Sequence, residues 1–293
     1  MGKTGLRVSQ LVFGTMSFGG DATAATSEAL FHACLDAGVN TFDCADVYSG
    51  GEAERILGRL AAPHRDSLVL TTKAYFPTGP DANARGSSRY HLTSAVNESL
   101  KRLKTDRIDL LFLHRFDDHT DLEQSLRAIE DLIRQGKVLY PAVSNFSAWQ
   151  TMKALGIAER LNLNPLVAIQ PMYNLVKRQA EVELLPMAKH ERVGVFPYSP
   201  LGGGLLSGKY TQTERPDAGR LVDNTMYQVR YADSDYFRCA QEFIGLAETL
   251  NVHPVSLAIA WVMAHPAVTA PIIGARSVEQ LQPALLSVDV EMT

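Results

Sequence analysis

Short apolar runs recur along the chain at intervals close to the length of one strand–helix unit. The predicted strands are residues 10–13, 39–43, 67–73, 108–114, 138–143, 166–170, 194–197 and 268–273. Each ends at or beside one of eight residues: Gly14, Asp43, Lys73, His114, Asn145, Gln170, Tyr198 and Gly274. From Gly14 to Tyr198 the steps are 29, 30, 41, 31, 25 and 28 residues. Amphipathic stretches between the runs, such as 91–103 and 122–133, have helical spacing.

Eight such units in 293 residues predict a (β/α)8 TIM barrel that forms a single domain over residues 1–293. A doubly wound open sheet is the alternative. The step before the last strand is longer, and we expect extra helices there at 236–250 and 254–265. The barrel is favoured because barrel enzymes build their sites at the carboxyl ends of the strands, where these polar residues fall.

Composition narrows the class of partner. The net charge is -4, from 28 basic and 32 acidic residues, and no basic run predicts a nucleic-acid surface. The 3 cysteines lack metal-binding or redox spacing, which predicts a reducing, cytoplasmic setting. We find no signal peptide, and no apolar run approaches the ~20 residues that cross a membrane. We therefore expect a small-molecule partner, while nothing in the sequence indicates an oligomeric state.

Three ionisable residues end consecutive predicted strands, and a tyrosine follows close behind. Because adjacent strands lie about 4.8 Å apart, Asp43, Lys73 and His114 should converge. Tyr48 lies in the loop after Asp43 and can bend over the barrel mouth. A free phenol has a pKa of about 10, and a nearby ammonium should lower it. Such a group can protonate a carbonyl oxygen.

The stretch GVNTFDCADVYSGGEAERILG, residues 38–58, resembles a signature of the aldo-keto reductase family. The resemblance continues at residues 72–73, 106–114, 136–138, 143–146 and 271–280, and is strongest with the microbial and potassium-channel-β-subunit-like branch. It implies a (β/α)8 barrel that reduces aldehydes and ketones with NADPH. Tyr48 would be the general acid, and Asp43, Lys73 and His114 would complete a catalytic tetrad. The alternative within this branch is an NADPH-binding, redox-sensing regulatory subunit with little turnover.

No Gly-x-Gly-x-x-Gly motif follows a predicted strand, so the dinucleotide must be held in another way. The resemblance implies contacts to the nicotinamide half from Gly14, Thr15, Met16, Asp43, Ser144, Asn145, Gln170 and Tyr198, the last by stacking on the ring. It implies contacts to the diphosphate from Ser199, Leu201 and Gly203, and to the adenosine end from Gly274, Arg276 and Gln280. Arg276 should grip a 2′-phosphate. Ala284 stands where the family often has Asn, so NAD(H) binding stays open beside the expected NADP(H).

Residues 203–209 spell G-x-x-x-x-G-K, the pattern of a P-loop without its final Ser or Thr. Tyr210 replaces the hydroxyl residue that would bind Mg²⁺, and Pro216 and Gly219 interrupt the helix that should follow. Barrels commonly bind phosphate after strands seven and eight, so these glycines should meet the diphosphate of a dinucleotide. A metal-dependent hydrolase using Asp43, Asp46 and His114 lacks a second pair of ligands, and no metal is expected.

The loops above the tetrad should form the substrate pocket. Its predicted walls are Phe18, Tyr48, Tyr75, Phe76, His114, Arg115, Phe116 and parts of residues 210–236. An aromatic rim suits an apolar or aromatic carbonyl compound, whereas Arg115 either favours an anionic group or pairs with Asp117 or Asp118. By comparison with the family, the small hairpin that closes the barrel bottom should be missing or incomplete, because Met1 begins within that segment.

Overall fold

The computed structural model describes residues 1–210, 216–217 and 219–292. Eight parallel strands form one sheet in the order β7-β6-β5-β4-β3-β2-β1-β8. The strands are β1 (Val12–Gly14), β2 (Thr41–Asp43), β3 (Val69–Ala74), β4 (Ile108–Leu113), β5 (Val138–Ser144), β6 (Ala168–Gln170), β7 (Gly194–Val195) and β8 (Ile272–Ile273). Backbone hydrogen bonds from Thr269 to Val195, at 2.9 Å, and from Ile272 to Pro197, at 2.8 Å, join the two ends of the sheet. The sheet is therefore a closed (β/α)8 barrel.

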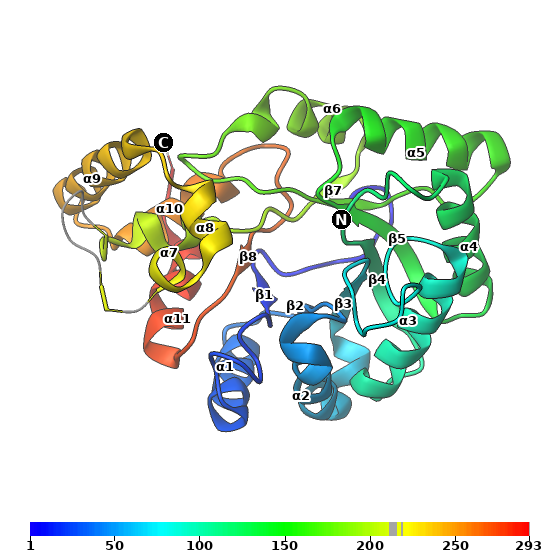
Figure 1. The fold of residues 1–293 in the computed structure, drawn as a ribbon. Helices are drawn as coiled ribbons and strands as arrows, with labels where there is room; N and C mark the ends of the chain where they lie inside the picture. Colours follow the sequence, from blue (N-terminus) through cyan, green and yellow to red (C-terminus); the bar gives the residue numbers. More distant parts are fainter. Residues whose placement is uncertain (211–215, 218, 293) are drawn as a thin grey trace.

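Helices surround the barrel (Figure 1). They are α1 (Ala24–Asp36), α2 (Glu52–Ala61), α3 (Arg89–Leu103), α4 (Leu122–Arg134), α5 (Ala148–Leu161), α6 (Leu184–Glu191) and α11 (Val278–Leu285), with α7 (Arg220–Asp223), α8 (Thr225–Arg230), α9 (Ser234–Thr249) and α10 (Pro254–Met263) between β7 and β8. Polar caps begin several of them: the Ser147 hydroxyl accepts from Gln150 at the start of α5, and the Gln150 side chain accepts in return.

The apolar residues form two main layers. One lies between the sheet and the outer helices, and the other fills the barrel with side chains such as Val12, Leu110, Phe112 and Phe196. A further apolar cluster joins α8, α9 and α10 to residues 205–210. This cluster holds the segment after β7 against the barrel, where it forms one wall of the cavity described below.

The predicted strands are found in order, with shorter ends. Pro141 lies inside β5, where its carbonyl accepts from the Val167 amide. The amide hydrogen that proline lacks would point to the same side, toward the residues that precede β6 (Ala168–Gln170). No hydrogen bond between the two strands is therefore lost. Only Ile272 and Ile273 of the predicted 268–273 run form β8. At the barrel bottom, residues 1–11 contain no strand: the Met1 amino group donates to the Leu6 carbonyl at 2.7 Å, and Met1, Leu6 and Val8 pack on the barrel interior.

Within the described ranges, no single helix is long and apolar enough to cross a membrane. Helices α9 and α10 reach that length and composition only as a pair, with a bend of 102° between them.

Candidate active site

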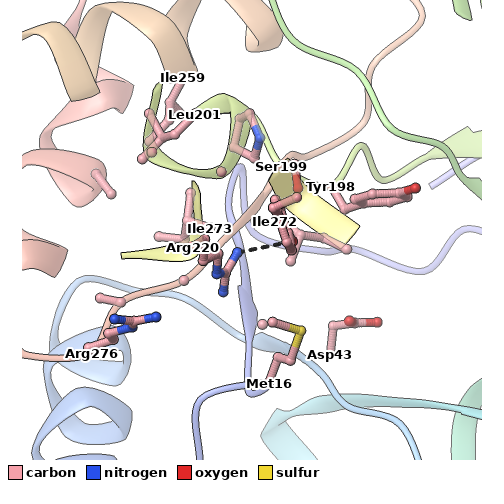
Figure 2. A pocket seen from close by; sticks show the side chains of 18 of the residues that line it. Met16, Asp43, Tyr198, Ser199, Leu201, Arg220, Ile259, Ile272, Ile273 and Arg276 are labelled. Carbon is pink, nitrogen blue, oxygen red and sulfur yellow. Dashed lines mark hydrogen bonds between the residues drawn. The ribbon is translucent and has the colours of Figure 1, made fainter. Parts of the chain in front are cut away.

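A cavity of about 1010 Å³ opens at the carboxyl ends of the strands, under the segment that contains α7 and α8. Figure 2 shows Asp43 and Tyr198 at one side of it and Arg276 at the other. Most residues predicted for the site line this cavity: Gly14, Met16, Asp43, Tyr48, Phe76, His114, Arg115, Ser144, Asn145, Gln170, Tyr198, Ser199, Leu201, Gly203, Gly274, Arg276 and Gln280. Residues from all parts of the chain thus meet in one place, as the barrel topology requires.

Lys73 lies fully buried beneath the cavity, and three oxygens surround its ammonium. Its Nζ donates to Asp43 Oδ2 at 2.5 Å and to the Cys44 carbonyl at 2.6 Å, and lies 3.2 Å from the Tyr48 hydroxyl. The short turn of residues 44–47 after β2 allows this contact, because it brings Tyr48 back over the end of β3. Three of the four predicted tetrad residues therefore form one hydrogen-bonded chain.

Further hydrogen bonds hold the Asp43 carboxylate in place. Its Oδ1 accepts from the Thr71 hydroxyl at 2.7 Å and from Gln170 Nε2 at 2.9 Å. The Asp43 carbonyl accepts from the Thr15 amide and from the Thr15 hydroxyl, at 2.8 and 3.0 Å. Because every partner comes from another strand or strand end, the barrel itself orients this carboxylate toward Lys73.

The pKa values of Lys73 and Tyr48 depend on both burial and neighbouring charges, and for Tyr48 the result differs from the sequence-based expectation. Burial alone would lower the pKa of Lys73, but the charge of Asp43 raises it above its usual value, so the side chain stays an ammonium. Burial raises the pKa of Tyr48 to about 12, although the charge of Lys73 acts to lower it. The expected net lowering of the Tyr48 pKa is therefore wrong for this structure, because desolvation outweighs the ammonium. Tyr48 is a neutral phenol that holds its proton.

His114 stands next to Tyr48, with 6.1 Å between the ring centroids and an interplanar angle of 80°. The Phe76 ring packs against its other side at 4.8 Å. Burial, and next the charge of Lys73, lower the pKa of His114 well below its usual value. Its Nδ1 atom is buried and has no hydrogen-bond partner among the described residues. His114 is thus a neutral imidazole beside the phenol, able to donate one hydrogen bond.

Residues at the carboxyl ends of β5 and β6 and after β7 form a second polar chain along the cavity wall. Asn145 has a φ of 57°, a left-handed conformation that Asn tolerates better than most residues. Its Nδ2 donates to the His114 carbonyl at 2.9 Å, and its Oδ1 accepts from the Tyr198 hydroxyl at 2.8 Å. The Ser144 hydroxyl donates to the Gln170 carbonyl at 2.9 Å. These bonds fix the positions of the polar groups that the resemblance assigns to a nicotinamide amide.

The glycine-rich stretch after β7 forms a compact turn, Gly202–Ser207, and not the loop and long helix of a P-loop. Gly203 and Gly204 have φ values of 70° and 98°, which favour glycine. A side chain at Gly203 would also collide with Tyr227, since an added Cβ would lie 2.7 Å from Tyr227 Cδ1. The glycines let α8 pack closely on this turn, and Gly203 and Gly204 line the cavity.

Two cations near this turn were missed as binding residues. Lys209 and Arg220 both line the cavity. Burial lowers the pKa of Lys209, and the charges of Arg276 and Arg220, which line the same cavity, lower it further. Lys209 was visible in the sequence as the lysine of the P-loop-like pattern. Arg220 had no such signal, because no regular spacing links it to the strand ends.

Arg276 lies before α11, at the far end of the cavity. Its guanidinium forms an ion pair with Asp21 at 2.9 Å, and its backbone amide donates to Gln280 Oε1 at 3.1 Å. The three cations and the glycine turn fit the charge and shape of a dinucleotide's phosphates. The residues present therefore suit such a cofactor in place of the absent Gly-x-Gly-x-x-Gly loop.

Several predicted contacts lie elsewhere. Phe18 is fully buried and packs on Phe13, with 5.7 Å between centroids, so its placement in the substrate pocket is wrong. Thr15 is buried and does not line the cavity, because its hydroxyl holds the Asp43 carbonyl. Tyr75 lies behind Phe76, and Phe116 packs on Phe146 and Trp149. Sequence position near a strand end did not reveal on which side each ring is buried.

Of the segment 210–236, predicted to contribute to the substrate pocket, Arg220, Met226, Tyr227 and Arg230 line the cavity. Residues 211–215 and 218 of that segment lie outside the described residues. Throughout the part of the chain that the structure describes, no group of three or more His, Cys, Asp or Glu side chains is arranged to hold a metal ion.

The barrel thus carries a hydrogen-bonded Asp43–Lys73–Tyr48 chain and several cationic side chains around one cavity. The chain belongs to the aldo/keto reductase family, whose pattern it matches over residues 10–293, and it is an oxidoreductase. It is 37% identical over 308 residues to the uncharacterized oxidoreductase YrpG of Bacillus subtilis (strain 168), covering 100% of this chain and 91% of that protein. It is 36% identical over 297 residues to probable voltage-gated potassium channel β subunits of Arabidopsis thaliana and Oryza sativa subsp. japonica, covering 99% of this chain and 90% of each.

Proposed function

We propose that this protein reduces the carbonyl group of an aldehyde or ketone to an alcohol with NADPH, and that Tyr48 is the general acid. The observation that carries the proposal is the position of the Tyr48 hydroxyl, 3.2 Å from a buried ammonium and at the wall of the cavity. Membership of an oxidoreductase family supports it. The buried Asp43–Lys73 pair would be costly without a role for its charge.

The bound cofactor would supply a hydride to the carbonyl carbon. Lys209, Arg220 and Arg276 would hold its phosphates, and the polar groups of Ser144, Asn145 and Gln170 would hold its nicotinamide end, with Tyr198 beside the ring. The glycine turn at 202–204 would let its backbone approach the diphosphate. These residues would fix the orientation of the reactants, which is a large part of such catalysis.

Tyr48 would give its proton to the carbonyl oxygen as negative charge develops there. The pKa of about 12 keeps the phenol protonated in the resting site, and an alkoxide is a strong enough base to take that proton. The Lys73 ammonium would then stabilise the phenolate that is left, at the distance of a hydrogen bond. Asp43 would keep Lys73 charged and aimed at Tyr48.

His114 would orient the substrate. A neutral imidazole can donate one hydrogen bond to the carbonyl oxygen beside the Tyr48 hydroxyl, and its low pKa ensures that it does not compete as an acid. Phe76 packs against the ring and restricts its movement.

The proposal is tested by mixing the purified protein with NADPH and a panel of aldehydes, ketones and sugars. We expect oxidation of NADPH and formation of the alcohol with at least one class of carbonyl compound. Tight NADPH binding without turnover across the whole panel would contradict the proposed reaction. Kd values for NADPH and NADH, measured in parallel, test the cofactor: tighter NADH binding would contradict the role given to Arg276.

A further inference from the structure

The cavity carries more positive charge than its own acidic residues neutralise. Five cationic side chains line it: Arg115, Lys209, Arg220, Arg230 and Arg276. Among the described residues, the acidic side chains that line it are Asp43 and Glu279. Lys73 already neutralises Asp43, and Asp21 pairs with Arg276 from outside the lining. An excess of positive charge in a cavity attracts anionic ligands.

Three of the five cations belong to the phosphate end. The charges of Arg220 and Arg276 both lower the pKa of Lys209, and all three line the same cavity. Arg276 lies across the cavity from Asp43 and Tyr198 in Figure 2. A dinucleotide's diphosphate, with the 2′-phosphate of NADPH, supplies the anions that this group requires.

Arg230 lies against the Tyr227 ring, which Arg220 also contacts, with 5.4 Å between the Arg220 guanidinium and the ring centre. Its charge opposes the effect of burial on the pKa of Tyr198 and of Tyr231, so it lies near both rings. Its guanidinium also lies 5.5 Å from the centre of the Tyr227 ring, a cation–π contact that holds it on the cavity wall. The Tyr198 hydroxyl bonds to Asn145, and Asn145 bonds to the His114 carbonyl, so these contacts connect the Tyr198 ring to the proton-donor end of the cavity.

Arg115 directly follows His114, and both line the same cavity. Pairing with Asp117, one of the sequence-based alternatives, does not occur. The Asp117 carboxylate accepts from the Ser87 amide, the His119 amide and the Thr120 hydroxyl, at 2.7, 3.0 and 2.7 Å. No ion pair joins Arg115 or Arg230 to a carboxylate within the described ranges.

The nicotinamide half of the reduced cofactor has no anionic group apart from the diphosphate, so it provides no counterion for Arg115, next to His114. We propose that the substrate is a carbonyl compound that also carries a carboxylate or phosphate group, and that Arg115 and Arg230 bind this anion while Tyr48 and His114 bind the carbonyl oxygen. The inference rests on the proposed function and gives it a substrate class. It resolves the alternative left open for Arg115 in favour of an anionic ligand.

A matched pair of substrates tests it. Para-carboxybenzaldehyde and its methyl ester have the same ring and the same aldehyde, and differ in the charge at the far end. We expect kcat/KM to be at least about ten-fold higher for the acid, since a charge-assisted hydrogen bond contributes this much. Added salt should reduce the difference. Glyceraldehyde 3-phosphate against glyceraldehyde shows whether phosphate serves as well as carboxylate.

Two variants assign the effect to the arginines. Arg115→Gln and Arg230→Gln should each lower the acid-to-ester ratio of kcat/KM by about ten-fold, mainly through KM of the acid. Arg160→Gln is the matched control, because Arg160 is an exposed arginine on the outer helix α5, and it should leave the ratio unchanged. NADPH binding in each variant shows that the barrel is folded.

The outcomes separate this inference from the proposed function. If neutral and anionic aldehydes are reduced equally well, or the neutral ones better, the anionic substrate class is wrong and the carbonyl reductase stands. If the two variants keep the acid-to-ester ratio, the anion is not bound by these arginines. If NADPH is oxidised with no member of either pair or of the wider panel, the proposed function itself fails, and the substrate class with it.

Discussion

Asp21 and Arg276 form an ion pair of 2.9 Å at the end of the cavity assigned to the adenosine phosphate. The Asp21 carboxylate therefore competes with a 2′-phosphate for the Arg276 guanidinium, and the two negative charges would lie near each other. Asp21→Asn should tighten NADPH binding by up to about five-fold, the value of an exposed ion pair, and change NADH binding little. Titration of both cofactors measures this. Asp36→Asn, at the exposed end of α1, is the control, and weaker NADPH binding in Asp21→Asn would show that the carboxylate assists the cofactor.

Asp46 is a buried acid in the turn after β2. It is 2% exposed, and neither of its carboxylate oxygens has a hydrogen-bond partner among the described residues. Burial, and next the negative charge of Glu54, raise its pKa from 3.8 to about 7. Because the folded state keeps a proton that the unfolded chain has lost, this group makes the free energy of unfolding fall as the pH rises from about 4 to 7.

Asp46→Asn removes that dependence. The difference in free energy of unfolding between the variant and the wild type should grow in favour of the variant as the pH rises from 4 to 8. It should grow by on the order of 1–4 kcal/mol, with most of the change complete near pH 7. Urea unfolding at several pH values measures the difference, and Asp106→Asn at an exposed position provides the control. A difference between variant and wild type that stays constant with pH would show that Asp46 is ionised throughout.

Gly203 tests the turn after β7. Gly203→Ala forces a side chain into a φ of 70° and against Tyr227, so it should lower the free energy of unfolding by about 1–3 kcal/mol and weaken dinucleotide binding. Gly156→Ala in α5 is the matched control, since no atom lies within 4 Å of the added Cβ there, and it should stabilise the protein by about 0.4–1 kcal/mol. Equal effects of the two changes would argue against a close approach of α8.

The site residues that could be predicted from the sequence are those at the ends of the regularly spaced barrel strands. Regular spacing of strands located Asp43, Lys73 and His114, because parallel barrel strands must bring their carboxyl ends together. Tyr48 followed from its loop position. The cations Arg220 and Arg230 could not be found in this way, since the path of the chain after β7 depends on packing among α8, α9 and α10.

Two further features depend on burial, which residue spacing does not report. Phe18 lies in the core, where Phe13 packs on it, although its position after β1 pointed to the pocket. The pKa of Tyr48 rises because desolvation exceeds the effect of Lys73, and the sequence revealed only the second of these opposing effects. Charge partners can be read from neighbouring strand ends, whereas the balance between charge and desolvation requires the structure.

Tyr48 is the proposed proton donor, and its hydroxyl can be removed without removing the ring. Tyr48→Phe removes the hydroxyl and keeps the ring that packs beside His114, so the barrel and the cofactor cradle should be unaffected. We expect kcat/KM for the best carbonyl substrate to fall by about 100-fold or more, the contribution of a general acid, while the Kd for NADPH stays at the wild-type value. A Tyr48→Phe protein that reduces the same substrate at the wild-type rate would contradict this role of Tyr48.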